Sequence, residues 1–400
     1  MDFDDTPEEA AFRQEVRSWL KKHAKEKDAG QLSTSHSFYD FDEVFVTEGK
    51  AWQRRLYEGG WAGITWPVEF GGRGGDVVQS MIFRQEEAQF DVTSGLFAVA
   101  IGMAGPTIID HGSEAQRARY LSAMLRGEEV WCQLFSEPGA GSDLASLATR
   151  AERDGDEWVV NGQKVWSSGA HHADMGILLV RTNPDLPKHR GITFFIVDMR
   201  SPGIEVRPLR QMTGGATFNE VFFTDVRVPA GNVVGEVNAG WRATMTTLAN
   251  ERTLSGGTSS FPQVLKLARE CGATSDPVIR QRLADCYAKS QIMRYLGFRI
   301  QTALSKGMST PESSVSKLFY AQMAREIAEV TLAIQGPRGM LLGPDAPEEG
   351  YWQQQFLTAP SLRIAAGSDE VQRNVIGERV LGLPHDVRLD KDVPFRDLIR

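Results

Sequence analysis

Residues 158–166, WVVNGQKVW, mark an abrupt change of sequence texture in the middle of a 400-residue chain. Two short runs of strand-forming residues flank an Asn-Gly pair, which is the strongest short-range signal for a hairpin turn. Further runs of β-branched and aromatic residues follow, separated by turn residues, at 177–180, 192–197, 204–209 and 220–228. The sequence therefore predicts a β domain, which we place at residues 131–230.

Helical patterns flank this β region on both sides. Near the N-terminus, apolar residues recur at helical spacing in a stripe formed by Phe12, Val16, Trp19 and Leu20. Pro67 and the glycine pairs at 71–72 and 74–75 divide this part of the chain into separate helices. Long helical patterns return after Gly240. This order of elements predicts an α+β fold, with helical domains at residues 1–130 and 231–400.

The composition is that of an ordinary globular protein, with 41% hydrophobic and 24% charged residues. The formal net charge is −8 and no run of Lys or Arg occurs, so we expect no nucleic-acid partner. No apolar run approaches the roughly 18–20 residues of a membrane helix, and the acidic start MDFDDTPEEAAF is unlike a leader peptide. Three widely spaced cysteines without a CxxC pair predict neither a disulfide framework nor a metal site. We therefore expect a cytoplasmic protein.

A glycine-rich stretch, FSEPGAGSDLAS at 135–146, opens the β region. It fails the dinucleotide fingerprint G-x-G-x-x-G, because Leu144 stands at the third glycine position. The stretch does supply exposed backbone amides and the hydroxyl groups of Ser136 and Ser142. It is therefore a candidate for binding a ligand by other means.

A second candidate stretch is KVWSSGA, in which Trp166 precedes Ser167 and Ser168. A planar ring beside hydroxyl donors suits a flat heteroaromatic cofactor that needs hydrogen bonds at its edge. Taken alone, these residues favour the plainer interpretation, which is a core tryptophan followed by loop serines.

Five motifs, taken together, resemble the acyl-CoA dehydrogenase family in their order and spacing. They are SEPGAGSD (136–143), NGQKVWSS (161–168), VGEVNAGW (234–241), the Glu-Arg pair at 251–252 and DEVQRNVIGERVLGLP (369–384). The resemblance runs essentially from end to end of the chain. It implies a barrel-like β domain between two helical domains, of which the C-terminal one contains a four-helix bundle. It also implies bound FAD and a homotetramer built as a dimer of dimers.

The resemblance assigns roles to individual residues. Ser136 would bind the pyrimidine edge of the flavin, Trp166 would flank its ring and Ser168 would approach its N5 atom. Ser142 would lie near the pantetheine arm of the substrate. The full set of cofactor contacts implied is Leu134, Phe135, Ser136, Trp166, Ser167, Ser168, Gly367, Ser368 and Glu370. The substrate contacts implied are Ser142, Arg252 and Ala366.

The catalytic base is displaced in this sequence. Much of the family carries it in a turn that reads Tyr-Glu-Gly-Thr, where this chain has Ala366. The isovaleryl- and long-chain-type branches instead place the glutamate on the first long C-terminal helix, and the matching residue here is Glu251, beside Arg252. Two distant segments can project a carboxylate into one pocket, so the base can move between them. The alternative is that Glu251 and Arg252 are surface charges on an amphipathic helix.

Two family motifs that contact FAD across subunits are missing or altered. No Arg-x-x-Phe-Gly occurs between Glu270 and Lys306, and the Gln-x-x-Gly-Gly turn is replaced by AIQGP at 333–337. Either FAD is held less strongly, or a different partner chain supplies the contact, or other arginines substitute. The arginines available are Arg280, Arg282, Arg294 and Arg299.

A basic loop at 183–191 gives a further, weaker candidate contact. Its residues Lys188, His189 and Arg190 could meet a CoA phosphate, although most such loops are merely solvated.

The function implied is an FAD-dependent acyl-CoA dehydrogenase that passes electrons to an electron-transfer flavoprotein. It would remove an α-proton from an acyl thioester while a β-hydride passes to flavin N5. Two alternatives remain open: a flavin oxidase or monooxygenase on the same fold, and a catalytically silent partner subunit of a hetero-oligomer. Branched, aromatic, dicarboxylic and steroid-derived acyl groups all fit the sequence.

Overall fold

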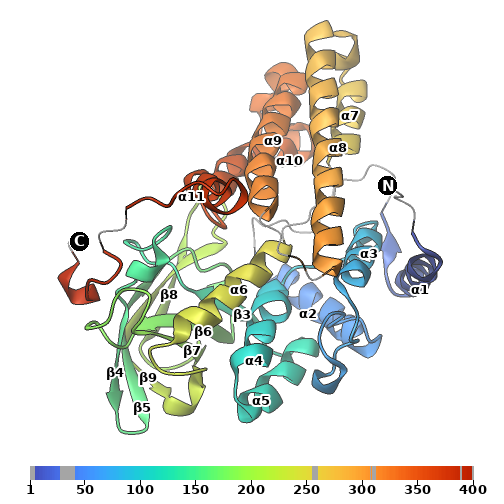
Figure 1. The fold of residues 1–400 in the computed structure, drawn as a ribbon. Helices are drawn as coiled ribbons and strands as arrows, with labels where there is room; N and C mark the ends of the chain where they lie inside the picture. The colour runs from blue at the N-terminus through green and yellow to red at the C-terminus, as the bar shows by residue number, and fades with distance from the viewer. Residues whose placement is uncertain are drawn as a thin grey trace.

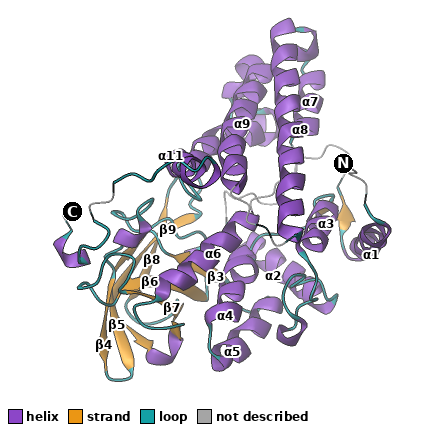
Figure 2. Ribbon diagram, viewed as in Figure 1, coloured by secondary structure: helices purple, strands orange, loops and turns teal. Residues whose placement is uncertain are grey.

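The computed structural model describes residues 5–27, 41–254, 260–306, 308, 312–387 and 390–398. Helices form both ends of the chain and a sheet forms its middle (Figures 1 and 2). The predicted α+β class and the order of helical, sheet and helical parts are therefore confirmed. None of the helices in the described ranges is both long and apolar enough to cross a bilayer.

The N-terminal part consists mainly of helices that begin at good capping residues. The side chains of Thr6, Asp76 and Ser113 each accept a hydrogen bond from the first turn, and the backbone N–H of each donates one to a side chain of that turn in return. The predicted stripe Phe12, Val16 and Leu20 is buried. The elements are α1 (Pro7–His23), β1 (Lys25–Glu26), α2 (Glu43–Glu58), η1 (Val68–Phe70), α3 (Val77–Glu87), β2 (Phe90–Asp91), η2 (Ala100–Ala104), α4 (Gly105–His111) and α5 (Glu114–Leu125).

The middle of the chain forms one eight-stranded sheet. Its strands are β3 (Trp131–Leu134), β4 (Arg150–Asp154), β5 (Glu157–Lys164), β6 (Met175–Arg181), β7 (Ile192–Asp198), β8 (Ile204–Leu209), β9 (Phe218–Pro229) and β10 (Val233–Val234). Their order is β10-β7-β6-β4-β5-β9-β8, with β3 paired to β6. All of β6 is buried, and so is β7 except its last residue, because helices or loops cover both faces there.

Strand β6 pairs with two different strands, one after the other, along the same edge. It pairs in parallel with β3 from Trp131–Met175 to Leu134–Leu178, and β4 joins it at Arg150–Arg181. Residues 135–149 therefore leave the sheet where one partner ends and the next begins. Both ends of this glycine-rich loop are fixed by the same strand.

The predicted hairpin at 158–166 is wrong, because β5 runs as one strand through Asn161 and Gly162. Strand β9 pairs with β5 on both sides of a register shift there. The side chains and backbone of Asn161 and Asp225 exchange two hydrogen bonds of 3.0 Å across the shift. Long-range pairing thus overrides the local turn signal and turns it into a bulge. The actual hairpin joins β4 to β5 through Gly155 and Asp156, where Asp154-Gly155 carries a turn signal of the same kind.

The C-terminal part contains the longest helices. They are α6 (Gly240–Leu254), α7 (Phe261–Glu270), α8 (Pro277–Ser305), α9 (Glu312–Gln335), α10 (Tyr351–Thr358) and α11 (Asp369–Val375). Helices α7 to α10 stand together in Figure 1 and share a core that includes Leu267, Leu283, Ile327 and Trp352. Helix α6 instead packs beside β7, η2 and α4.

The last described residues return to the β domain (Figure 1). The Phe395 N–H donates to the Leu186 carbonyl over 2.9 Å, and the Arg396 N–H donates to the Pro184 carbonyl over 3.0 Å. The Arg181 guanidinium lies 3.9 Å from the centre of the Phe395 ring. Residues 390–398 and the loop at 182–191 are thereby fastened to each other.

Gly162 and Gly155 offer a matched test of the contact between β5 and the glycine-rich loop. Both have positive φ, but a Cβ on Gly162 would lie 2.7 Å from the Thr149 Cα, whereas one on Gly155 would meet nothing within 4 Å. We expect Gly162→Ala to cost about 1–3 kcal/mol more unfolding free energy than Gly155→Ala, the usual cost of overpacking. Urea unfolding of the two variants measures the difference, and equal losses would contradict the close approach.

Candidate functional site

The ends of β3 and β5 bring two of the predicted cofactor segments together. The Val165 N–H donates to the Ser136 carbonyl over 2.9 Å, and the Lys164 ammonium donates to the Phe135 carbonyl over 3.0 Å. The segment Leu134, Phe135 and Ser136 therefore lies beside the turn that carries Trp166, Ser167 and Ser168.

Trp166 has an unusual backbone conformation. Its φ is 62°, although bulky residues rarely adopt positive φ, and 59% of the residue is exposed. Its ring makes one edge-on contact with Phe218, at 5.9 Å between centroids. The predicted core tryptophan is thus excluded, and a strained backbone holds an aromatic ring with most of its surface free for another planar group.

The turn after Trp166 is held by the start of β9. Ser167 and Gly169 donate their N–H groups to the carbonyls of Asn219 and Thr217 at 3.1 and 2.9 Å. The Asn219 amide donates back to the Ser167 carbonyl over 2.9 Å. The Ser167 hydroxyl is buried, and no partner for it occurs in the part of the chain that the structure describes. An unsatisfied buried hydroxyl is costly, so this position favours a hydrogen-bonding ligand.

The glycine-rich loop is open at its tip. A Cβ added to Gly139 or Gly141 would meet nothing within 4 Å, and Ser142 is exposed. Behind the tip, the Lys188 ammonium lies 2.9 Å from Asp143 and 2.6 Å from Asp390. Its side chain is only 12% exposed, so Lys188 is already neutralised within the chain and does not present a free cation to a CoA phosphate.

The turn around Ala366 and Gly367 forms a separate part of the site. Both residues have positive φ, at 52° and 88°. The Gln372 amide donates to the Ala366 carbonyl over 3.1 Å, and the Lys317 ammonium of α9 donates to the Gly367 carbonyl over 2.6 Å. Ser368 caps α11. Within the described ranges no acceptor is recorded for the N–H groups of Ala366 and Gly367, which leaves them available to a ligand.

Helix α6 is anchored against β7, α4 and η2. The helix starts against β7, where a Cβ on Gly240 would lie 2.5 Å from the Phe194 nitrogen. It then meets α4, because the Thr247 hydroxyl lies 2.8 Å from that of Thr107, and the Thr246 hydroxyl lies 2.8 Å from the His111 imidazole.

Glu251 lies one turn beyond Thr247 on the same face of α6. Glu251 is half-buried. In the chain, η2 comes directly before α4, the helix that contains Thr107. A half-buried Glu251 differs from the solvated helix face of the alternative interpretation, and its role as the base stays a prediction. The Arg252 side chain lies outside the described residues, as do residues 255–259.

The turn of π-helix η2 was not predicted from the sequence. The Gly105 N–H bonds the Ala100 carbonyl, and the freed Ile101 carbonyl accepts a hydrogen bond of 3.0 Å from the Trp66 indole. Such π turns are rare and often occur at functional sites. The available signal was Pro106, which has no N–H to donate to the Ile101 carbonyl.

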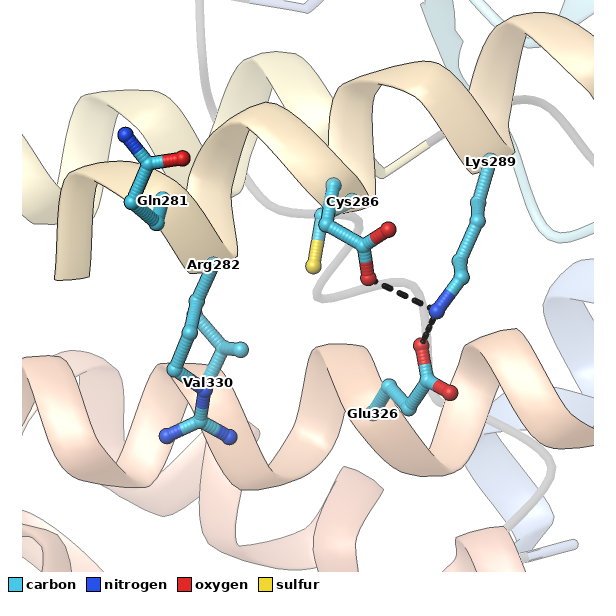
Figure 3. Close-up of a pocket in the computed structure, with 7 residues that line it drawn as sticks. Gln281, Arg282, Cys286, Lys289, Glu326 and Val330 are labelled. Carbon is cyan, nitrogen blue, oxygen red and sulfur yellow. Dashed lines mark hydrogen bonds and ion pairs between the residues drawn. The ribbon is translucent and has the colours of Figure 1, made fainter. Parts of the chain in front are cut away.

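A cavity of about 330 Å³ lies between α8 and α9 (Figure 3). Lys289 bridges Asp285 and Glu326 at one end, and Arg282 points between the two helices at the other. Positive and negative charges are balanced here, so the cavity does not form an anion site. Arg282, one of the arginines that could replace the missing motif, is thus turned into the helix pair.

Comparison with known families decides what these parts form. The family model "Acyl-CoA dehydrogenase, N-terminal domain" matches residues 6–128, the middle-domain model matches 132–226 and the C-terminal-domain model matches 238–381. The chain belongs to the acyl-CoA dehydrogenase family. Like other members, this acyl-CoA dehydrogenase is an FAD-dependent oxidoreductase that dehydrogenates an acyl-CoA.

Its relatives include curated and solved acyl-CoA dehydrogenases. Acyl-CoA dehydrogenase IpdE1 of Mycolicibacterium smegmatis is 38% identical over 402 residues, which cover 94% of this chain and 98% of that protein. FadE34 of Mycobacterium tuberculosis is 42% identical over 323 residues, which cover 80% of this chain and 44% of that protein. The structure titled "Tcur3481-Tcur3483 steroid ACAD" superposes with a TM-score of 0.83 at 29% identity, and covers 96% of this chain and 100% of that one.

The observed geometry fits a flavin in this acyl-CoA dehydrogenase. An exposed ring at Trp166, an unpaired buried hydroxyl at Ser167 and the open tip at Gly139 and Gly141 together match a planar, hydrogen-bonding cofactor. Of the substitute arginines, Arg294 lies 5.4 Å from the Phe298 ring on its own helix.

The strain at Trp166 generates a prediction. Trp166→Asn removes a contact with Phe218 worth about 0.5–1.5 kcal/mol, but relieves about 1–3 kcal/mol of backbone strain, because Asn tolerates positive φ. We expect the thermal midpoint of the FAD-free protein to stay unchanged or rise, while the dissociation constant for FAD increases at least about tenfold, or about 1.4 kcal/mol. Differential scanning calorimetry and fluorescence titration measure the two effects.

Trp352→Ala is the matched control, because Trp352 is 1% exposed in the C-terminal core. It should lose about 3–5 kcal/mol of stability. A loss of similar size for Trp166→Asn would show that Trp166 is a packing residue instead.

Proposed function

We propose that this acyl-CoA dehydrogenase desaturates a ring-bearing, steroid-derived acyl-CoA to the 2,3-enoyl-CoA, with Glu251 as the catalytic base. The observation that supports the proposal is the anchoring of α6 to α4 one turn before the half-buried Glu251, together with the packing of α6 against η2. Electrons would then pass to an electron-transfer flavoprotein.

FAD, when bound, would accept the β-hydride. The side chains and backbone of this chain would remove the α-proton and stabilise the charge on the thioester oxygen. Glu251 takes the α-proton, since its carboxylate stands on a helix that is fixed to α4 by two hydroxyl contacts. The N–H groups of Ala366 and Gly367 donate to the thioester oxygen, where negative charge develops as the proton leaves. Loss of a carboxylate at Ala366 leaves this second role intact, because the backbone provides the donors.

Trp166, Ser167 and Ser168 would hold the flavin ring with Leu134, Phe135 and Ser136, while Gly367, Ser368 and Glu370 would meet the dinucleotide. The open loop tip at Ser142 would admit the pantetheine arm. These segments come from β3, β5 and α11, so the site forms only when the β domain and the C-terminal helices are folded together.

The proposed substrate class rests on the residues packed next to α6. Ala98, Val99 and Gly102 are half-buried at or beside η2, and so is the larger Ile101. A fused-ring acyl group needs width that straight-chain substrates do not. Two relatives support this class by their names: the steroid dehydrogenase structure above, and cyclohexane-1-carbonyl-CoA dehydrogenase of Geobacter metallireducens, which is 30% identical over 82% of this chain.

The assembly proposed is a hetero-oligomer with a paralogous chain, with the homotetramer as the alternative. The chain lacks the arginine motif that grips FAD across subunits, so a partner that retains it would complete the site. One similar structure is named as a complex of two components, ChsE4 and ChsE5 of Mycobacterium tuberculosis. It superposes with a TM-score of 0.81 at 30% identity and covers 96% of this chain. Apolar side chains are exposed along the C-terminal helices, at Val278, Tyr287, Ile292, Tyr295 and Phe356.

Glu251→Gln tests the base directly. Gln keeps the size of the side chain but cannot accept a proton, so anaerobic flavin reduction by a steroid-derived acyl-CoA should slow at least about 10²–10⁴-fold. FAD content should not change. Glu236→Gln, in the exposed loop before α6, is the matched control and should reduce flavin at the parent rate. Parent-like reduction by Glu251→Gln would remove Glu251 from this role.

The acyl group and the electron acceptor are tested with the unmodified protein. Steroid-derived acyl-CoAs should bleach the flavin faster than straight-chain acyl-CoAs of equal carbon number, measured by anaerobic stopped-flow absorbance. Rapid recolouring in air with formation of peroxide would indicate an oxidase. Failure of every acyl-CoA to bleach bound FAD would indicate a silent subunit.

A further inference from the structure

A buried ion pair lies between the two flavin-binding segments of the β domain. The Lys164 ammonium is fully buried and lies 2.7 Å from a Glu137 carboxylate oxygen. Glu137 is only 8% exposed. Burying two charges is expensive, and such a pair can often be replaced by apolar residues without loss of stability. A gain in folding stability therefore does not by itself explain the Glu137–Lys164 pair.

The pair is adjacent in sequence to both flavin segments. Glu137 follows Ser136 directly, and Lys164 stands two residues before Trp166. The ammonium also donates to the Phe135 carbonyl over 3.0 Å. The backbone of the segment predicted to meet the flavin pyrimidine is thus bound directly to a cation.

The carboxylate faces the other way, toward the far end of the glycine-rich loop. It accepts the Ala148 N–H over 2.6 Å and the Thr149 N–H over 2.9 Å. Burial pushes the pKa of Glu137 up, but the Lys164 charge and these hydrogen bonds lower it further, so the group remains ionised. The pair is therefore a fixed dipole whose positive end lies at the Phe135 carbonyl and whose negative end lies at Ala148 and Thr149.

We propose that the Glu137–Lys164 pair is a positioning pair that raises the reduction potential of the bound flavin. The flavin gains negative charge when it accepts a hydride, and the positive end of a buried dipole next to its binding segment favours that state. The carboxylate holds both ends of the loop in place and keeps the ammonium buried. This inference rests on the placement of FAD in the proposed function.

The test is a comparison of potentials among three holoproteins: the parent, Lys164→Met, and the double variant Glu137→Gln/Lys164→Met. Lys164→Met removes the cation and leaves a buried anion, so its flavin potential should fall the most. The double variant removes both charges and the dipole, so its potential should fall less. The expected order is parent, then double variant, then Lys164→Met, measured by equilibration with a reference dye.

A purely structural role predicts a different result. Both variants would then bind FAD more weakly by a similar factor, with potentials equal to the parent's, and the proposal would be overturned. Should the single variant fail to fold, the double variant decides alone: a lowered potential supports the proposal and an unchanged one refutes it.

Lys289→Met is the matched control, because Lys289 also pairs with carboxylates but lies between α8 and α9. It should leave the potential unchanged, and an equal shift there would also overturn the proposal. Absence of FAD from the parent protein would instead refute the proposed function itself.

Discussion

The parallel pairing of β3 and β4 with a single strand, β6, is the constraint on which the site depends. Because β3 leaves the sheet at Leu134 and β4 enters it at Arg150, the loop between them has both ends fixed by one buried strand. Strand β6 in turn is paired with β7 along its whole length, and α6 packs beside β7. The glycine-rich loop and the helix that carries Glu251 are thus positioned from the same central strands.

Sequence patterns predicted the parts of this arrangement that depend on local chemistry. The stripe of Phe12, Val16 and Leu20, the apolar runs of β6 and β7, and the long C-terminal helices could all be recognised from periodicity. The family resemblance supplied the roles proposed for Glu251 and Trp166, which no local pattern indicates.

Features set by long-range contacts could not be predicted. The Asn161-Gly162 signal failed because pairing with β9 determines the backbone there, and the Ile101 carbonyl freed in η2 is paired with the indole of Trp66, which lies 35 positions earlier. The Glu137–Lys164 pair joins residues 27 positions apart, and nothing in either neighbourhood indicates that the two side chains meet. The positive φ of Trp166 is likewise imposed by the strands on either side of it. The features that could not be predicted are therefore the backbone conformations and side-chain pairings that tertiary contacts impose on individual residues.

The fastening of residues 390–398 to the loop at 182–191 has a consequence for synthesis of the chain. On the ribosome, the β domain emerges long before the residues that bind its loop, and Arg181 has no Phe395 ring beside it until that later segment is made. The loop between β6 and β7 therefore stays uncovered while some 200 residues are added, about 10–40 seconds at ordinary elongation rates. Completion of the middle domain is in this way tied to synthesis of residues 390–398.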